Sequence, residues 1–232
     1  MPDTLRLCPW PPYHLRTHLL RYGQGQGAEK SFDDYMASKR PPTSMKQWFE
    51  TFPISQKFSD AKSDPESVLI VDVGGGPGQE LAGLRSAHPE LRGRYILQDL
   101  PITLNRISDT IDGVEKMPHD FFTVQPAKGA RAYFMRDIMN NWSDAKYTMI
   151  LRNIVDAMDR EYSTLLIDQY VLPSTGADMR AAEMDIHMLP HTSGIQRTVP
   201  MWEKLFDGVG LETVRIWNDE GSHESVIETR KR

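Results

Sequence analysis

A glycine-rich segment that begins with an acid carries the clearest chemistry in this chain. It runs Asp72-Val-Gly-Gly-Gly-Pro-Gly78 and directly follows an apolar run. Glycines such as Gly74, Gly76 and Gly78 let the backbone turn tightly and approach a ligand where a side chain would clash. If a helix begins after Gly78, its first N–H groups face the same ligand. The segment therefore predicts a small-molecule site at a strand-to-helix turn.

Two acids indicate what kind of ligand this site would take. Asp72 stands at the end of the apolar run, where a carboxylate suits a cationic amino group better than a phosphate. Asp99 follows a second apolar run, 99 − 78 = 21 residues after Gly78, where an acid accepts ribose hydroxyls in nucleotide-binding α/β folds. No Lys-Ser or Lys-Thr follows the glycines, which excludes a P-loop. These residues alone leave NAD and S-adenosylmethionine as alternatives.

Strands that alternate with helices must position these residues. Hydrophobic patterning predicts strands at 68–73, 95–98, around Lys116, 131–135 and 164–167, and helices at 78–87, 101–108, 144–158, 179–189 and 200–207. The last two strands, 212–217 and 224–229, are predicted to form a hairpin. This alternation is typical of an α/β domain with a mainly parallel sheet, whose last strand is antiparallel.

The first 65 residues differ from the rest, because they are rich in proline, glycine and polar residues. Short helices are predicted at 30–38 and 44–50, separated by Pro41 and Pro42, since proline cannot continue a helix interior. We expect an irregular helical segment over residues 1–65 and a ligand-binding domain over residues 66–232.

Composition excludes several classes of function. Of the 232 residues, 39% are hydrophobic and 25% charged, which is typical of a globular protein. The net charge of −5 without a basic stripe argues against nucleic acid as a partner. The apolar runs are too short for a membrane span or a signal peptide. A single cysteine, Cys8, excludes an internal disulfide, and a cytoplasmic protein is expected.

Five further motifs occur in a specific order. They are Gln98-Asp-Leu-Pro101, His119-Asp-Phe-Phe122, Gly129-Ala-Arg-Ala-Tyr133, Asn141-Trp-Ser-Asp144 and Val171-Leu-Pro173. With the glycine segment, they resemble the small-molecule O-methyltransferases of plants and, more closely, of fungal secondary metabolism, over about residues 31–228. The resemblance implies a Rossmann-like class I methyltransferase sandwich with seven strands. It also implies S-adenosylmethionine as the cofactor and a small secondary metabolite as the substrate.

The resemblance assigns roles to individual positions. Asp72 and the glycines would hold the methionine part of the cofactor, with Arg136 nearby. Asp99 and Leu100 would bind the ribose, and Asp120 and Phe121 would lie beside the adenine. The residues implied to line the substrate pocket are Trp142, Met139, Met184, His187 and Met188.

The sequence departs from the family where its catalytic base is expected. The histidine that opens the family's His-Asp-Trp motif is replaced by Asn140, and the two glutamates that orient it are replaced by Gln169 and Gln196. Each replacement keeps roughly the same shape but cannot accept a proton near neutral pH. A general base typically contributes ~10²–10⁴-fold to a rate. Methylation by this chain is therefore expected only for an acidic phenol or a carboxylate.

Other activities remain open. Some fungal relatives do not methylate, but use the bound sulfonium with Arg, His and Asp residues to promote dehydration or pericyclic ring formation. Arg136, Asp137 and His191 are the residues that could serve such a cofactor-assisted cyclase or dehydratase here. A pseudoenzyme that binds the cofactor and regulates a partner is a third hypothesis. No metal is expected, because Pro190 breaks the helix that would align His187 with His191.

Assembly also differs from the family pattern. Family members usually carry an N-terminal dimerisation domain that closes the substrate pocket, and this chain is expected to be without it, as a fragment, a mis-started gene product or a minimal form. Homodimers are usual in the family, but we expect this chain to be monomeric or only weakly associated.

Overall fold

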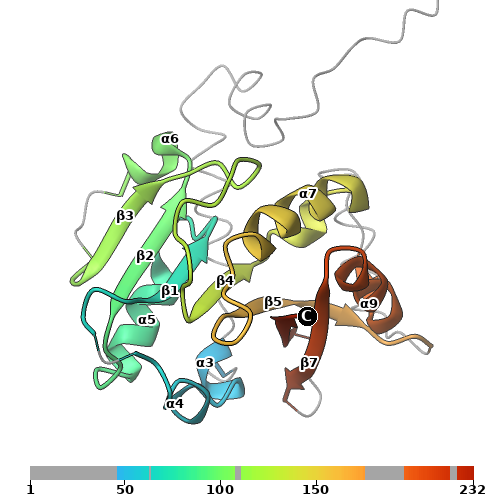
Figure 1. The fold of residues 1–232 in the computed structure, drawn as a ribbon, viewed down its shortest axis with the longest axis horizontal. Helices are drawn as coiled ribbons and strands as arrows, with labels where there is room; N and C mark the ends of the chain where they lie inside the picture. Colours follow the sequence, from blue (N-terminus) through green and yellow to red (C-terminus); the bar gives the residue numbers. More distant parts are fainter. Residues whose placement is uncertain (1–45, 63, 108–110, 176–195, 220–223) are drawn as a thin grey trace, which may run out of the picture. The chain divides into compact units, whose positions relative to one another are not determined.

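The computed structural model describes residues 46–62, 64–107, 111–175, 196–219 and 224–232 (Figure 1). All of them belong to one compact unit, Lys46–Arg232. The predicted helices at 30–38 and 179–189 lie outside the described residues.

The described residues build one mixed sheet. Its strand order is β3-β2-β1-β4-β5-β8-β7, and a short additional strand, β6, pairs with β5. All pairs along the sheet are parallel except those of β8, which runs antiparallel to both β5 and β7. The mainly parallel sheet and the antiparallel last strand are thus confirmed, whereas β6 was not predicted. The strands are β1 Val68–Val73, β2 Arg94–Asp99, β3 Val114–Pro118, β4 Ala132–Arg136, β5 Thr164–Leu172, β6 Arg197–Thr198, β7 Leu211–Asn218 and β8 Glu224–Lys231.

Helices cover both faces of this sheet (Figure 1). α7 and α9 pack on one face, where Tyr133 and Met135 of β4 enter their hydrophobic core. α3, α4, α5 and α6 pack on the other face, with Phe134 between those two residues, because successive strand side chains point to opposite faces. The helices are α3 Trp48–Thr51, α4 Ile54–Lys57, α5 Gln79–Ala87, α6 Pro101–Leu104, α7 Asp144–Val155 and α9 Val199–Asp207, with a 3₁₀ turn, η1, at Met139–Asn141.

Three predicted helices differ from their expected bounds, and the one predicted at 144–158 ends at Val155. Residues 44 and 45 of the helix predicted at 44–50 lie outside the described residues, and the described helix runs from Trp48 to Thr51, where Gln47 and Glu50 form a capping box at its start. The helix predicted at 101–108 ends at Leu104, with Asn105 as its C-cap. Because asparagine is a weak helix former, the helix ends after the single turn that begins at Pro101.

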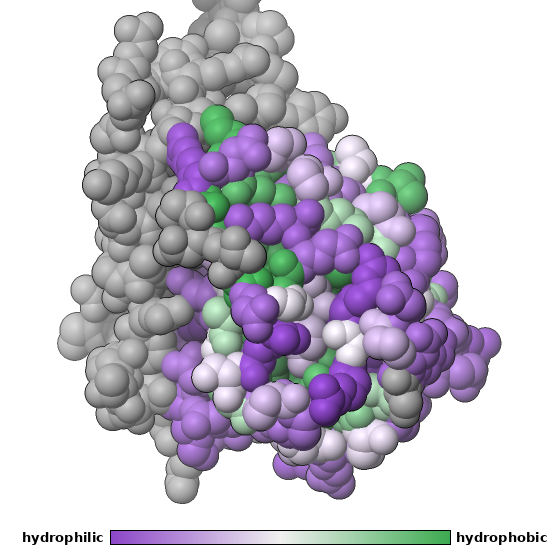
Figure 2. Space-filling view, turned by 90° about the vertical axis from the view of Figure 1, so that its left-hand side faces the viewer, coloured by the Kyte–Doolittle hydropathy of each residue, from purple (hydrophilic) through white to green (hydrophobic). Residues whose placement is uncertain are grey.

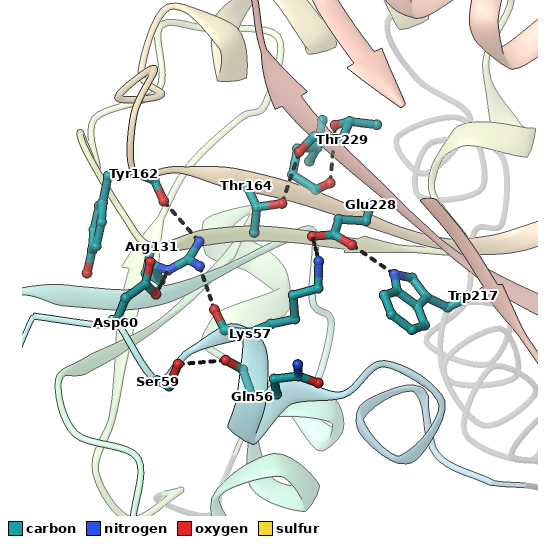
Figure 3. Close-up of polar contacts among 11 residues, drawn as sticks. Gln56, Lys57, Ser59, Asp60, Arg131, Tyr162, Thr164, Trp217, Glu228 and Thr229 are labelled. Carbon is teal, nitrogen blue, oxygen red and sulfur yellow. Dashed lines mark hydrogen bonds and ion pairs between the residues drawn. The ribbon is translucent and has the colours of Figure 1, made fainter. Parts of the chain in front are cut away.

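A buried polar cluster joins α4 to the amino ends of the strands (Figure 3). Lys57 of α4 donates to Glu228 of β8 at 2.8 Å, and the indole of Trp217 donates to the second oxygen of that carboxylate at 2.9 Å. Arg131 bridges to the carbonyl oxygens of Lys57 and Tyr162. These bonds satisfy buried charges and hold residues 54–60 against the sheet.

Five large apolar side chains are exposed among the described residues. Figure 2 shows hydrophobic residues in small areas among hydrophilic ones on the described part of one side. Singly exposed apolar side chains such as Val124, which is 71% exposed, are normal on a folded protein. Within the described ranges, no helix has the length and apolar character needed to cross a bilayer.

Candidate active site

The glycine loop lies where the sequence predicts it, between β1 and α5. Gly74, Gly76 and Gly78 all have positive φ, at 76°, 58° and 80°, a conformation that side-chain-bearing residues rarely adopt. The N–H groups of Gly74 and Gly75 donate to the carbonyl of Gln98 on β2 at 2.8 and 3.0 Å. A Cβ added at Gly76 would meet no described atom within 4 Å. The tip of the loop therefore faces open space, as a ligand cradle requires.

Asp99 fixes the loop from the end of the neighbouring strand. One of its carboxylate oxygens accepts from the N–H of Gly76 at 2.9 Å, and the other accepts from Leu100 at 2.7 Å. A carboxylate offers about four acceptor positions. Asp99 can therefore hold the loop and also accept hydroxyls of a ribose at the same edge of the sheet.

Aromatic side chains border the loop on a second side. An added Cβ at Gly74 would meet Ile138 at 2.8 Å and Phe121 at 3.6 Å, so both side chains lie against the loop. Phe121 also packs edge-to-face on Trp142, with ring centroids 6.0 Å apart. Asp120 accepts from the N–H of Phe122 at 3.0 Å, which orders this turn. The residues predicted to flank an adenine are thus close to the glycines.

Buried charges of mostly negative sign lie behind the loop. Arg136, at the end of β4, donates to Glu80 of α5 at 2.7 Å and pairs with Asp168 of β5 at 3.2 Å. Its third contact, with Glu224 of β8, is longer at 3.9 Å. Asp72 lies close to Glu80 and Asp99 and is 1% exposed. Three buried carboxyl groups, those of Asp72, Glu80 and Asp168, therefore share one guanidinium.

This crowding perturbs the acid–base equilibria of the cluster. Burial, reinforced by Glu80 and Asp99, raises the pKa of Asp72 well above its usual range, against the opposing effect of Arg136. Burial also raises the pKa of Asp168 to about 8. For Arg136, burial alone would lower the pKa, but the carboxylates of Asp168 and Glu80 outweigh it and raise the pKa.

The acidic groups at this position discriminate between the two ligands that the sequence leaves open. A dinucleotide would bring a pyrophosphate to the glycine loop, where it would meet the carboxyl groups of Asp72 and Glu80, and the nearby guanidinium of Arg136 is already shared with Asp168. A ligand with an ammonium or sulfonium group would be attracted by the same carboxylates. The described residues therefore fit S-adenosylmethionine and do not fit NAD.

The elements that carry the expected base position meet beside this cluster. Asn140 lies in η1, directly after β4, and Gln169 lies on β5, which pairs with β4. Gln196 immediately precedes β6, which pairs with β5 in the register Val171 to Arg197. Gln169 and Gln196 are 2% and 4% exposed. Met139, predicted as a substrate contact, is buried in the core beneath the turn.

Arg197 holds these elements together. Its buried side chain donates to the carbonyls of Met139 and Trp142, each at 3.0 Å, and to the carboxylate of Asp144 at 2.8 Å. The guanidinium also lies over the rings of Tyr147 and Trp202, 5.2 and 5.5 Å from their centroids. The turn that carries Asn140 and the strand that follows Gln196 are therefore fixed to each other.

For several other predicted site residues, the structure gives an unusual backbone conformation or no description. Asp137 has a φ of 51°, which is a strained conformation for a residue with a side chain, and its carbonyl accepts from Asn141 at 2.9 Å. Met184, His187, Met188 and His191 lie outside the described residues. Among the residues that are described, no group of three or more His, Cys, Asp or Glu side chains could hold a metal ion.

Sequence reasoning missed Glu80, Asp168 and Arg197. Asp168 interrupts the apolar run 164–167 and its continuation, and Glu80 is an acid in the first turn of the helix after the glycines. Both positions signal a buried charge that needs a partner.

A separate surface cavity of about 370 Å³ lies by the amino ends of β1 and β2, near Val68 and Arg94, and none of the predicted site residues borders it.

Comparison with known proteins identifies the family. Residues 59–212 match the sequence model of the O-methyltransferase domain. The chain belongs to the O-methyltransferase family. Methyltransferase cfoC of Aspergillus candidus is 37% identical over 204 residues, which cover 87% of this chain and 50% of that protein. Demethylsterigmatocystin 6-O-methyltransferase stcP of Emericella nidulans is 37% identical over 198 residues, covering 85% and 94%.

Several solved structures share the fold of this chain. LepI in complex with S-adenosylmethionine superposes with a TM-score of 0.82 at 32% identity, covering 90% of this chain and 54% of LepI. A structure described as a pericyclic reaction enzyme gives 0.81 at 33%, covering 89% and 53%. OxaC with S-adenosylhomocysteine and oxaline gives 0.80 at 28%, covering 93% and 53%.

These findings bear directly on the sequence predictions. The chain spans about half the length of cfoC and of these solved structures. The Rossmann-like class I methyltransferase fold and the resemblance to fungal O-methyltransferases are confirmed. Family membership also supports S-adenosylmethionine as the cofactor, as predicted.

Proposed function

We propose that this chain binds S-adenosylmethionine and methylates an acidic hydroxyl or carboxyl group of a small secondary metabolite without a general base. The proposal is supported by Asn140, Gln169 and Gln196, which stand where the family resemblance implies one histidine and two glutamates, together with a glycine loop that is kept. The elements that bear these three residues converge at one end of the sheet, which supports a common role. Homologues in fungal secondary metabolism support the substrate class.

The residues present fit the cofactor. Asp72 and the glycine loop would hold its methionine part, Asp99 would bind its ribose, and Phe121 would lie beside its adenine. S-adenosylmethionine supplies a methyl group on a sulfonium, and the methyl moves to a substrate oxygen as S-adenosylhomocysteine leaves. When that oxygen arrives as an anion, no proton has to be removed, and positioning supplies most of the rate enhancement.

A second candidate is a cofactor-assisted cyclase or dehydratase that does not transfer the methyl group. The similarity to a pericyclic reaction enzyme, at 33% identity, favours it. In this chain Arg136 is already engaged by Glu80 and Asp168. That engagement makes Arg136 less available to a substrate, so methylation is the stronger of the two proposals.

The two candidates are separated by following the methyl group. The purified chain is incubated with methyl-labelled S-adenosylmethionine and phenols that differ in acidity. We expect label in the products of the acidic phenols, with a rate that rises with pH by up to about tenfold per unit until the phenol's own pKa. S-adenosylhomocysteine should accumulate in equal amount. Substrate conversion without S-adenosylhomocysteine would favour the cyclase, and efficient methylation of a neutral alcohol would contradict the loss of the base.

A further inference from the structure

The carboxyl groups of Asp72 and Glu80 each keep one oxygen without a hydrogen-bond partner among the described residues. The atoms are Oδ2 of Asp72 and Oε2 of Glu80, and both are buried. A buried carboxylate oxygen without a donor is costly. Native structures rarely leave such atoms unsatisfied unless a ligand or a proton satisfies them.

The position of these oxygens points to the glycine loop. A Cβ added at Gly75 would lie 2.3 Å from Oδ2 of Asp72, so this oxygen lies directly under the loop. Glu80 belongs to the first turn of α5, immediately after the loop, and its other oxygen is held by Arg136 at 2.7 Å. The two open oxygens therefore flank the segment that would hold the methionine part of the cofactor.

The charges around Asp72 leave an unbalanced negative charge. Glu80 faces it from α5 and Asp99 from β2, and Arg136 of β4 is the cation that opposes them. Arg136 is itself shared with Asp168 of β5 and, at a longer distance, Glu224 of β8. One guanidinium cannot neutralise this many carboxylates, so either a proton or a cationic ligand group must complete the balance.

We propose that Asp72 and Glu80 form a paired-carboxylate subsite for the ammonium group of the cofactor's amino-acid part, and that this subsite loses a proton when the ammonium group binds. The proposal rests on the proposed function, because it assumes S-adenosylmethionine as the ligand, and it adds Glu80 to the cofactor site. In the ligand-free chain a proton on Asp72 reduces the repulsion from Glu80 and Asp99. The ammonium group takes over that role and the proton goes to solvent. Binding is then weakened at low pH, because the proton competes with the ligand.

Titration calorimetry in two buffers of different ionisation enthalpy measures this proton directly. S-adenosylhomocysteine is the probe, since it carries the amino-acid part but no sulfonium, and 5′-methylthioadenosine, which lacks the amino-acid part, is the comparison. Near neutral pH, we expect binding of S-adenosylhomocysteine to release protons and binding of 5′-methylthioadenosine to release almost none. Both measurements use the unmodified chain, so they do not depend on the folding of a variant.

Two isosteric variants assign the proton. Asp72→Asn should bind S-adenosylhomocysteine without releasing a proton, which excludes the ligand's own amino group as the source. Glu80→Gln should reduce the proton release, because it removes one of the two carboxylates whose repulsion adds to burial in raising the pKa of Asp72, and should also weaken binding of S-adenosylhomocysteine relative to 5′-methylthioadenosine. Gln79→Ala, at the start of the same helix, is the control and should leave the proton release unchanged.

The outcomes separate this proposal from the proposed function. Binding of S-adenosylhomocysteine with equal heats in both buffers would overturn the paired-carboxylate subsite and leave the proposed function standing. Equal proton release by both ligands would also overturn it. If S-adenosylhomocysteine and S-adenosylmethionine both fail to bind, the proposed function itself fails.

Discussion

The triple variant Asn140→His, Gln169→Glu, Gln196→Glu is expected to methylate an ordinary phenol ~10²–10⁴ times faster than the unmodified chain. The three positions belong to elements that pair with one another, through β4 with β5 and β5 with β6. An imidazole at position 140 can take the phenol's proton, and the two carboxylates can fix its tautomer and stabilise its charged form. The measurement is the initial rate of labelled methyl transfer to a phenol that is mostly protonated at the assay pH.

The single variants decide whether the three groups act as a unit. Asn140→His alone should gain little, because neutral amides at 169 and 196 cannot stabilise an imidazolium. The gain of the triple variant should therefore exceed the product of the three separate gains. An acidic phenol, which arrives ionised, should be methylated at nearly the same rate by the triple variant and the unmodified chain. A full gain from Asn140→His alone, or no gain from the triple variant, would contradict this interpretation of the three positions.

Replacing Arg197 by alanine is expected to lower the free energy of unfolding by roughly 3–5 kcal/mol. The substitution leaves the carbonyls of Met139 and Trp142 without their donor and opens a cavity between the rings of Tyr147 and Trp202. Arg197→Lys should lose less, because it keeps the charge but not the planar fork that reaches several acceptors. Urea unfolding followed by fluorescence measures both variants.

Arg160 provides the matched control. Its side chain is 69% exposed and pairs only loosely with Glu161, at 3.8 Å, so Arg160→Ala should change the free energy of unfolding by less than about 0.5 kcal/mol. If Arg197→Ala were as mild as Arg160→Ala, Arg197 would not be the residue that fixes the Asn140 turn.

The sequence predicts the parts of this fold that rest on local patterns. The run 68–73 with its following glycines is enough to place β1, the loop and α5, because an apolar strand and a glycine turn leave few other structures. The hairpin of β7 and β8 follows from two β-rich runs joined by a polar turn. β6 escapes prediction because Arg197 and Thr198 form only two residues of strand, and their pairing with β5 depends on tertiary contacts.

The residues of the candidate site also fall into those that local motifs predict and those that only the tertiary structure brings together. Asp72, Asp99 and Phe121 could be predicted because they belong to contiguous motifs beside the glycine loop. Glu80, Arg136 and Asp168 come from three separate elements, and only the register of β4 with β5 and the position of α5 bring them together. Whether such charges are paired or repel each other depends on distances and burial, which a sequence does not contain.

Titration of the unmodified chain with S-adenosylmethionine and with NAD tests the central claim most directly. The cluster of carboxyl groups behind the glycine loop, from Asp72, Glu80 and Asp168, predicts that S-adenosylmethionine binds and that NAD does not. Asp99→Ala should weaken the binding of S-adenosylmethionine by about 1–3 kcal/mol, through lost hydrogen bonds at a buried site. Binding of NAD without binding of S-adenosylmethionine would contradict the account.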